Sequence, residues 1–134
     1  MVVRNMNKLR QAIVSSAIAK ATLDETNRVS RRFRFKPDFI GFSGHFPGYP
    51  ILPAFVQILT AITIIEEHKK CRLELATVEK AKFHLPLHPD LEIEVTCAQR
   101  QVQDKSICEA RLTVTEGLAS SFRFTFAEER NSPC

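Results

Sequence analysis

The chain has 134 residues, enough for one hydrophobic core, so we expect a single domain over residues 1–134. Apolar residues make up 44% of it and charged residues 25%, a balance that excludes a disordered or fibrous chain. No apolar run approaches the roughly 18 residues of a membrane-spanning helix, and residues 1–10 lack the apolar core of a signal peptide. These features predict a cytoplasmic protein with no membrane partner.

The cysteines argue against the usual zinc modules. There are four of them, with no C-x-x-C pair and no spacing typical of a metal site. We expect them to be reduced and structural, and we expect no metal and no bound cofactor. The four are Cys71, Cys97, Cys108 and Cys134.

The first third of the chain predicts a short helix and a hairpin. Residues 5–13 place Met6, Leu9 and Ile13 on one side of a helix. Residues 15–23 and 28–36 are expected to be strands, joined by turn-forming residues at 24–27. In the second strand, phenylalanines at 33 and 35 alternate with basic residues, which is typical of a half-buried strand.

Residues 44–53, GHFPGYPILP, are expected to form a shaped loop. They contain three prolines and two glycines, which exclude a regular helix or a central strand. Residues 53–65 are apolar on almost every side of a helical wheel and predict a buried helix, with Pro53 in its first turn. Residues 66–70 are charged and are interpreted as the solvated end of that helix.

Four further strands are predicted, at residues 73–85, 91–101, 105–116 and 118–127. The last of them places Phe122, Phe124 and Phe126 on one face. A helix that is apolar all round, beside an antiparallel sheet, must be wrapped by that sheet. The pattern therefore predicts an α+β protein with one long buried helix in the concavity of an antiparallel sheet.

Two motifs resemble a known family. GHFPGYPILP resembles the signature loop of hotdog-fold 3-hydroxyacyl-(acyl carrier protein) dehydratases, and KAKFHLPLHPD at 80–90 is similar to the strand and turn that follow in that family. Gln57 resembles the subgroup associated with aryl-polyene synthesis. The resemblance implies a hotdog fold, a homodimer or an assembly of dimers, and sites built from two chains.

The resemblance also implies where the site lies. His45 would be the base that removes the C2 proton of a 3-hydroxyacyl thioester, and a non-proline cis bond is expected in the His45–Phe46 region. Backbone N–H groups at the start of the helix would hold the thioester oxygen as it gains negative charge. The expected substrate-binding residues are Phe46, Pro53, Ala54, Phe55 and Leu59.

Leu59 departs from the family, whose catalytic acid falls at this position. Gln57 points about 200° away around the helix, and Glu66 returns to within about 20° but lies roughly 10 Å further along the axis. Neither replaces a carboxylate at position 59. His84 and His88 flank a proline and are interpreted as surface residues, with an approach to a partner's site as the alternative.

We therefore expect a dehydratase-like hydro-lyase acting on carrier-linked thioesters in fatty-acid or polyene synthesis, with weak or altered activity. One alternative is a non-catalytic acyl-chain-binding or structural subunit that pairs with an active homologue. Another is an acyl thioesterase, although thioesterases of this fold also depend on an acidic residue in or near the same helix.

Charge points to an acidic partner. The formal net charge is +4, and five basic residues cluster in the second predicted strand. Nucleic acid is not expected, because the aromatic residues of that strand alternate away from the basic ones. Acyl carrier protein is the expected partner. The basic residues are Arg28, Arg31, Arg32, Arg34 and Lys36.

Overall fold

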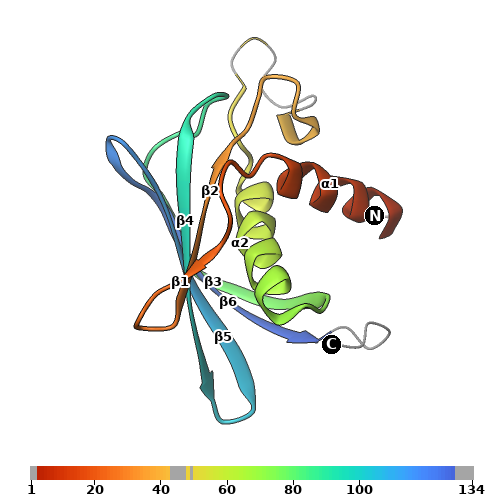
Figure 1. Ribbon diagram of the computed structural model, residues 1–134, viewed down its shortest axis with the longest axis vertical. Helices are drawn as coiled ribbons and strands as arrows, with labels where there is room; N and C mark the ends of the chain where they lie inside the picture. The colour runs from red at the N-terminus through yellow and green to blue at the C-terminus, as the bar shows by residue number, and fades with distance from the viewer. Residues whose placement is uncertain (1–2, 43–47, 49, 129–134) are drawn as a thin grey trace.

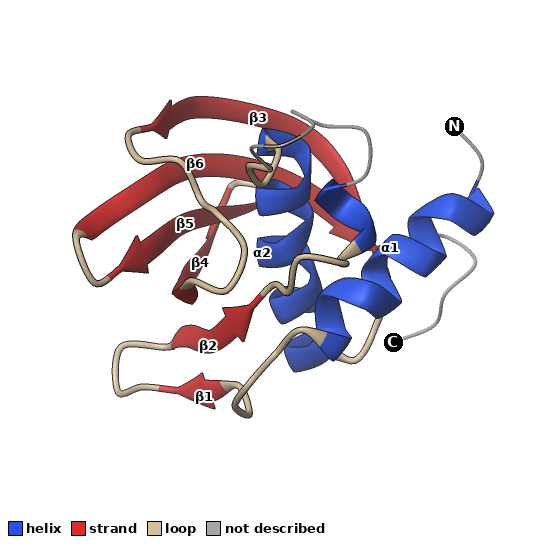
Figure 2. Ribbon diagram, turned by 90° about the horizontal axis from the view of Figure 1, so that it is seen from above, coloured by secondary structure: helices blue, strands red, loops and turns tan. Residues whose placement is uncertain are grey.

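One curved sheet of six strands wraps around helix α2 in the computed structural model, and helix α1 lies on the other side of α2 (Figures 1 and 2). The structure describes residues 3–42, 48 and 50–128. The helices are α1 (Val3–Ser15) and α2 (Ala54–Lys69), with a short 3-10 turn at Ile40–Phe42. The strands are β1 (Thr22–Leu23), β2 (Arg28–Arg34), β3 (Leu73–Phe83), β4 (Glu92–Val102), β5 (Lys105–Val114) and β6 (Gly117–Glu128).

The sheet has the order β1-β2-β4-β5-β6-β3, and every neighbouring pair is antiparallel. Its inner face carries the apolar residues that the alternating pattern predicted. Phe33 pairs with Ile93, and Cys108 pairs with Phe124, all of them buried. Because each strand has a period of two, the polar residues between them face outward.

Helix α2 fills the concavity of the sheet. All its residues from Val56 to Ile65 are buried, so the expected buried helix is confirmed. The helix continues to Lys69 and ends at Lys70, which adopts the left-handed conformation with φ 59°. The prediction of an antiparallel sheet around one long buried helix is therefore confirmed, and the arrangement is that of a hotdog fold.

Helix α1 is two residues longer at each end than predicted, and an ion pair ties it to α2. Arg10 donates from Nε and Nη2 to the two carboxylate oxygens of Glu66, both at 3.0 Å. The backbone N–H of Leu73 donates to the same carboxylate at 2.9 Å. Glu66 is therefore a half-buried residue that joins α1, α2 and β3, and its interpretation as part of a solvated helix end is wrong.

The strand predicted at residues 15–23 is the main error in secondary structure. Ser15 belongs to α1, Ala17 makes a single bridge to Phe33, and only Thr22–Leu23 forms a strand. Between those contacts the carbonyl of Ala19 accepts a hydrogen bond from Arg31 Nε at 2.8 Å, so a side chain takes the place of a β-ladder bond there.

Cysteines occupy both the sheet and the turn after α2. Cys97 and Cys108 are free thiols on the inner face, fully buried. Cys71 is disulfide-bonded, so the expectation of reduced cysteines is wrong for this residue. A hydrogen bond with Cys97, together with burial, raises the pKa of the Cys108 thiol, so it stays protonated and is a poor nucleophile.

Candidate functional site at the start of α2

The predicted site falls partly on described residues. Pro53, Ala54, Phe55 and Leu59 belong to α2 or its cap. His45, Phe46 and the cis bond expected in that region lie outside the described residues. The geometry of the site is therefore built from the α2 side.

The first turn of α2 presents backbone N–H groups without a side-chain cap. Pro53 is the N-cap residue, with φ −65° and ψ 154°, and it makes no capping hydrogen bond from its side chain. The first helical hydrogen bond runs from Gln57 N to Pro53 O at 3.1 Å. Ala54 and Phe55 are exposed, whereas the helix is buried from Val56 onward. The positive end of the α2 dipole therefore faces open space, where it can stabilise a negatively charged oxygen.

A buried polar network fixes this helix start. Gln57, 4% exposed, donates from Nε2 to the carbonyl of Leu52 at 3.0 Å. Its Oε1 accepts a hydrogen bond of 2.7 Å from the hydroxyl of Ser120 on β6. The backbone N–H of Leu52 donates to the carbonyl of Leu87 at 2.8 Å, so both backbone polar groups of Leu52 are hydrogen-bonded. The chain entering α2 is thus tied to β6 and to the segment after β3.

Sequence reasoning did not identify Ser120 as the partner of Gln57. A signal was present, because Ser120 has the same parity as Phe122 and so faces inward with the phenylalanines of β6. A serine on a buried apolar face needs a hydrogen-bond partner. The partner itself depends on how α2 lies against the sheet, which the periodicity does not determine.

Ser120→Ala is expected to lower the free energy of unfolding by about 1–3 kcal/mol, because it leaves Gln57 Oε1 buried without its donor. Urea denaturation of the variant and the parent protein measures this difference. Ser121→Ala is the matched control, since the neighbouring serine faces outward and should change stability by no more than about 0.5 kcal/mol. Equal stability of Ser120→Ala and the parent would show that the network contributes little.

Leu59 brings no proton-transfer group to the helix. It is 1% exposed and belongs to the hydrophobic core. The buried stretch of α2 contains no ionisable residue, and its two threonines are already hydrogen-bonded within the helix, Thr60 to Val56 O and Thr63 to Thr60 O, both at 2.7 Å. The acid position of the family is therefore apolar in this chain.

Residues considered as substitutes for the acid lie elsewhere. Glu66 is held by Arg10 and by the backbone of Leu73. His84 is exposed, as interpreted from the sequence. His88 is half-buried, and its Nδ1 lies 3.4 Å from the carbonyl oxygen of Pro50, so this ring contacts the loop that leads into α2. Within the described ranges, no group of three or more His, Cys, Asp or Glu side chains is placed to share a metal ion.

Of the five basic residues predicted to cluster on the second strand, all but Arg31 are exposed, and Arg28, Arg32, Arg34 and Lys36 form a basic row on one face. Arg32 and Arg34 are 53% and 43% exposed, and both pair with Glu92 of β4, at 3.3 and 3.4 Å. Arg31 has the opposite parity, points toward α2 and pairs with Glu67, so it does not belong to this surface.

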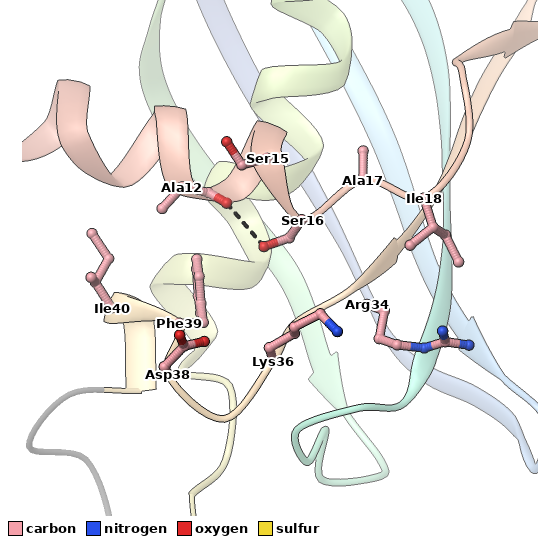
Figure 3. Close-up of a pocket in the computed structure, with 10 residues that line it drawn as sticks. All are labelled: Ala12, Ser15, Ser16, Ala17, Ile18, Arg34, Lys36, Asp38, Phe39 and Ile40. Atoms are coloured by element: carbon pink, nitrogen blue, oxygen red, sulfur yellow. Dashed lines mark hydrogen bonds between the residues drawn. The ribbon is translucent and has the colours of Figure 1, made fainter.

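A groove of about 360 Å³ lies beside the end of this row (Figure 3). Arg34 and Lys36 line one side of it, and Ser15 and Ser16 at the end of α1 line another. The Ser16 hydroxyl is already bonded to the carbonyl of Ala12 at 2.9 Å. No residue of α2 lines this groove, so it is separate from the helix start.

Known proteins share this sequence pattern and fold. A family model described as ApeI-like, ApeI dehydratase, matches residues 21–124. The 3-hydroxyacyl-(acyl-carrier-protein) dehydratases FabZ of Alkaliphilus metalliredigens and Koribacter versatilis are 36% and 37% identical over 97 and 94 residues. The matches cover 64% and 54% of this chain, and the chain spans only 64% and 60% of those relatives' own lengths.

Solved structures confirm the fold. The dehydratase heterocomplex ApeI:P from Xenorhabdus doucetiae aligns with TM-score 0.68 and 19% identity, over 83% of this chain and 96% of that one. A hypothetical thioesterase with coenzyme A from Streptococcus pneumoniae aligns with TM-score 0.64 and 8% identity, over 92% and 96%.

The sheet wrapped around α2 defines a hotdog-fold protein, and the first turn of α2 has no side-chain cap. Within that class, the chain belongs to the ApeI-like dehydratase family. No helix in the described part of the chain is long and apolar enough to cross a bilayer.

Proposed function

We propose that this protein acts on carrier-linked 3-hydroxyacyl thioesters as a dehydratase-like hydro-lyase. The observation that carries the proposal is the uncapped first turn of α2, directly after the histidine motif, in a chain of the ApeI-like dehydratase family. A thioester oxygen needs such donors as the C2 proton leaves, because negative charge develops on it. The substrate is cytoplasmic in this proposal, together with its carrier protein.

The proposed reaction needs a base at C2 and hydrogen-bond donors at the thioester oxygen. His45, as a neutral imidazole, takes the proton from C2, and the N–H groups of Ala54 and Phe55 donate to the thioester oxygen. Phe46 and Pro53 contact the acyl chain, which must open the core beside α2 to reach Leu59. The departing hydroxyl takes its proton from water, because this chain offers no carboxylic acid at position 59, and His45 returns the C2 proton to the solvent, so we expect slow turnover.

Turnover of a 3-hydroxyacyl thioester and its 2-enoyl product by the purified protein tests the proposal. Interconversion that is lost in His45→Gln, with the fold retained, supports it. Release of free thiol instead of enoyl product would favour the thioesterase alternative. Binding of the thioester without either reaction would favour a non-catalytic acyl-chain binder.

A second candidate is a subunit that pairs with an active homologue. Leu59 favours it, because a buried leucine cannot take part in proton transfer. The ApeI:P dehydratase from Xenorhabdus doucetiae is a heterocomplex, so a protein of this fold can work in such a pair. In this candidate the homologue supplies the carboxylic acid, and this chain shows turnover only in complex with it.

The unpaired edge of the sheet supports assembly with a second chain. Strand β3 is the last strand in the sheet order, and all its residues except Leu73 are exposed. Three of them are large apolar residues, Leu75, Val78 and Phe83, exposed by 37%, 38% and 46%. An open apolar edge strand is a template for pairing with another strand. We propose that β3 lies in a homodimer interface, or in the interface with the homologue of the second candidate.

Reversal of the basic row, Arg32→Glu with Arg34→Glu, is expected to slow association with acyl carrier protein. The two new carboxylates would join Glu92 and Glu94 and repel an acidic partner. Titration of carrier protein at low and high salt measures the effect, since exposed charges are screened over about 8 Å at physiological ionic strength. Binding of a short free thioester should stay nearly unchanged.

The matched control for this experiment is Lys8→Glu with Lys20→Glu, which makes the same change in net charge on exposed residues outside the basic row. Equal loss of carrier binding in both double variants would mean that overall charge, and not the β2 row, steers the carrier.

A further inference from the structure

The outer face of the sheet carries a second charged surface, over strands β5, β6 and β3. It surrounds a hollow of about 530 Å³, within the size range of small-ligand sites. Five of the lining residues are charged, four of them basic. This surface lies away from α2, which faces the opposite side of the sheet (Figure 2). The lining residues are Lys80, Lys82, Glu109, Ala110, Arg111, Ser121, Phe122 and Arg123.

Two adjacent rows across these strands have opposite charge patterns. In the first row, Arg123 of β6 lies between two carboxylates, since it pairs with Glu109 of β5 on one side and with Glu79 of β3 on the other. In the second row, Ser121 lies between two cations, since it pairs with Arg111 and with Lys82. Directly opposed residues of neighbouring strands have their Cβ atoms about 4.5–5.5 Å apart on the same face. The second row therefore has two cations and no carboxylate between them to neutralise their charge.

A β-bulge adds a third cation beside Ser121. The pairing of β3 with β6 shifts between Glu79 and Lys82, and Lys80 within the shift has a φ of 54°. A bulge re-aims side chains and is found next to functional sites more often than elsewhere. Here it brings Lys80 to the wall of the same hollow as Lys82.

These cations have few partners of their own. Among the described residues, Glu109 forms ion pairs with Arg100 and Arg123, and no ion pair includes Lys80, Lys82 or Arg111. Arg123 Nε is buried and has no hydrogen-bond partner among the described residues. Buried donors are normally satisfied, so an unpaired one indicates a missing acceptor nearby. Glu109 is already paired with Arg100 and Arg123, so Lys80, Lys82 and Arg111 repel one another, and a bound anion would relieve this repulsion.

We propose that the hollow centred on Ser121 binds the phosphate group of a small phosphorylated ligand. Arg111 and Lys82 contact the phosphate oxygens from either side, the Ser121 hydroxyl donates from below, and Lys80 adds charge from the bulge. A phosphate group carries about 1.5–2 negative charges and three strong acceptor oxygens, which matches several converging donors better than a single carboxylate does. The hollow is larger than one phosphate ion, so it also accommodates the organic part of a phosphomonoester.

Titration at constant ionic strength tests the site, with inorganic phosphate in one arm and glycerol 3-phosphate in the other, followed by the backbone amide NMR signal of Ser121. We expect saturable binding that weakens by about tenfold or more in Lys82→Gln with Arg111→Gln, because charge-assisted hydrogen bonds are lost. The control is Lys8→Gln with Lys20→Gln, which removes the same two charges elsewhere and should change affinity by no more than about twofold.

The outcomes separate the sources of the phosphate. Tighter binding of glycerol 3-phosphate supports a phosphomonoester ligand, and equal binding in both arms supports a site for free phosphate. Equal weakening in both double variants overturns the proposal, because it would show a general effect of charge. Absence of saturable binding in both arms also overturns it. None of these results depends on dehydratase turnover, so the site and the proposed function fail or stand separately.

Discussion

Leu59→Glu is expected to raise the rate of dehydration by about 10²–10⁴-fold, the usual contribution of a general acid or base. The substitution places a carboxyl group at the position where the family carries its catalytic acid, on the second turn of α2. Leu59 is fully buried, so desolvation should raise the pKa of the new carboxyl above its ordinary value. A carboxyl that keeps its proton near neutral pH is suited to protonate the departing hydroxyl.

Leu59→Gln is the matched control, because glutamine has nearly the same shape as glutamate but cannot donate a proton as an acid. We expect no gain with glutamine and a gain with glutamate, measured as kcat/KM for a 3-hydroxyacyl thioester. The same rate for both variants, with the fold retained, would mean that position 59 does not face the reacting carbon. A parent protein as fast as an enzyme with the acid would mean that another group already donates the proton.

The stability of Leu59→Glu should depend on pH in a defined direction. A raised carboxyl pKa in the folded state means that the folded protein favours the protonated form more than the unfolded chain does. The variant should therefore be least destabilised below the unfolded pKa of about 4.3. Stability should fall as pH rises from there toward the folded pKa. Thermal unfolding of Leu59→Glu and Leu59→Gln across this range measures the difference.

Much of the fold could be predicted because burial leaves a periodic record in the sequence. Strands β2, β4, β5 and β6 each have a mostly buried face and helix α2 is buried all round, so their apolar residues repeat with period two or fill a helical wheel. The segment at 15–23 lacks such a face. Its small residues fit a strand locally. However, α1 extends to Ser15, and the Arg31 guanidinium donates a hydrogen bond to the Ala19 carbonyl, where a neighbouring strand would otherwise donate.

Side-chain pairs across the fold were harder to predict than the elements. Glu66 stands among charged residues at a helix end, which is typical of a solvated position, yet α1 brings Arg10 against it. Ser120 pairs with Gln57 across 63 residues of sequence. Such contacts depend on how two elements pack, and the periodicity of each element does not contain that information. The apolar residue at position 59, in contrast, was evident directly from the family motif.

The strongest test of the second candidate uses a mixed complex. The partner is a homologue of this family that carries Asp or Glu at the position matching Leu59. The family resemblance implies sites built from two chains, and we propose for this candidate that each site takes its histidine from one chain and its acid from the other. A mixed dimer then has one complete site, made of His45 and the homologue's acid, and one incomplete site, in which the homologue's histidine faces Leu59.

His45→Asn in this chain is therefore expected to lower turnover of the mixed complex by about 10²–10⁴-fold, although the homologue keeps its own histidine. The matched substitution of the homologue's histidine should leave turnover nearly unchanged, because that histidine belongs to the incomplete site. Turnover of each mixed complex is measured after its two-chain composition has been verified. The reverse dependence, with the homologue's histidine essential and His45 dispensable, would show that this chain supplies neither group and serves as a structural subunit.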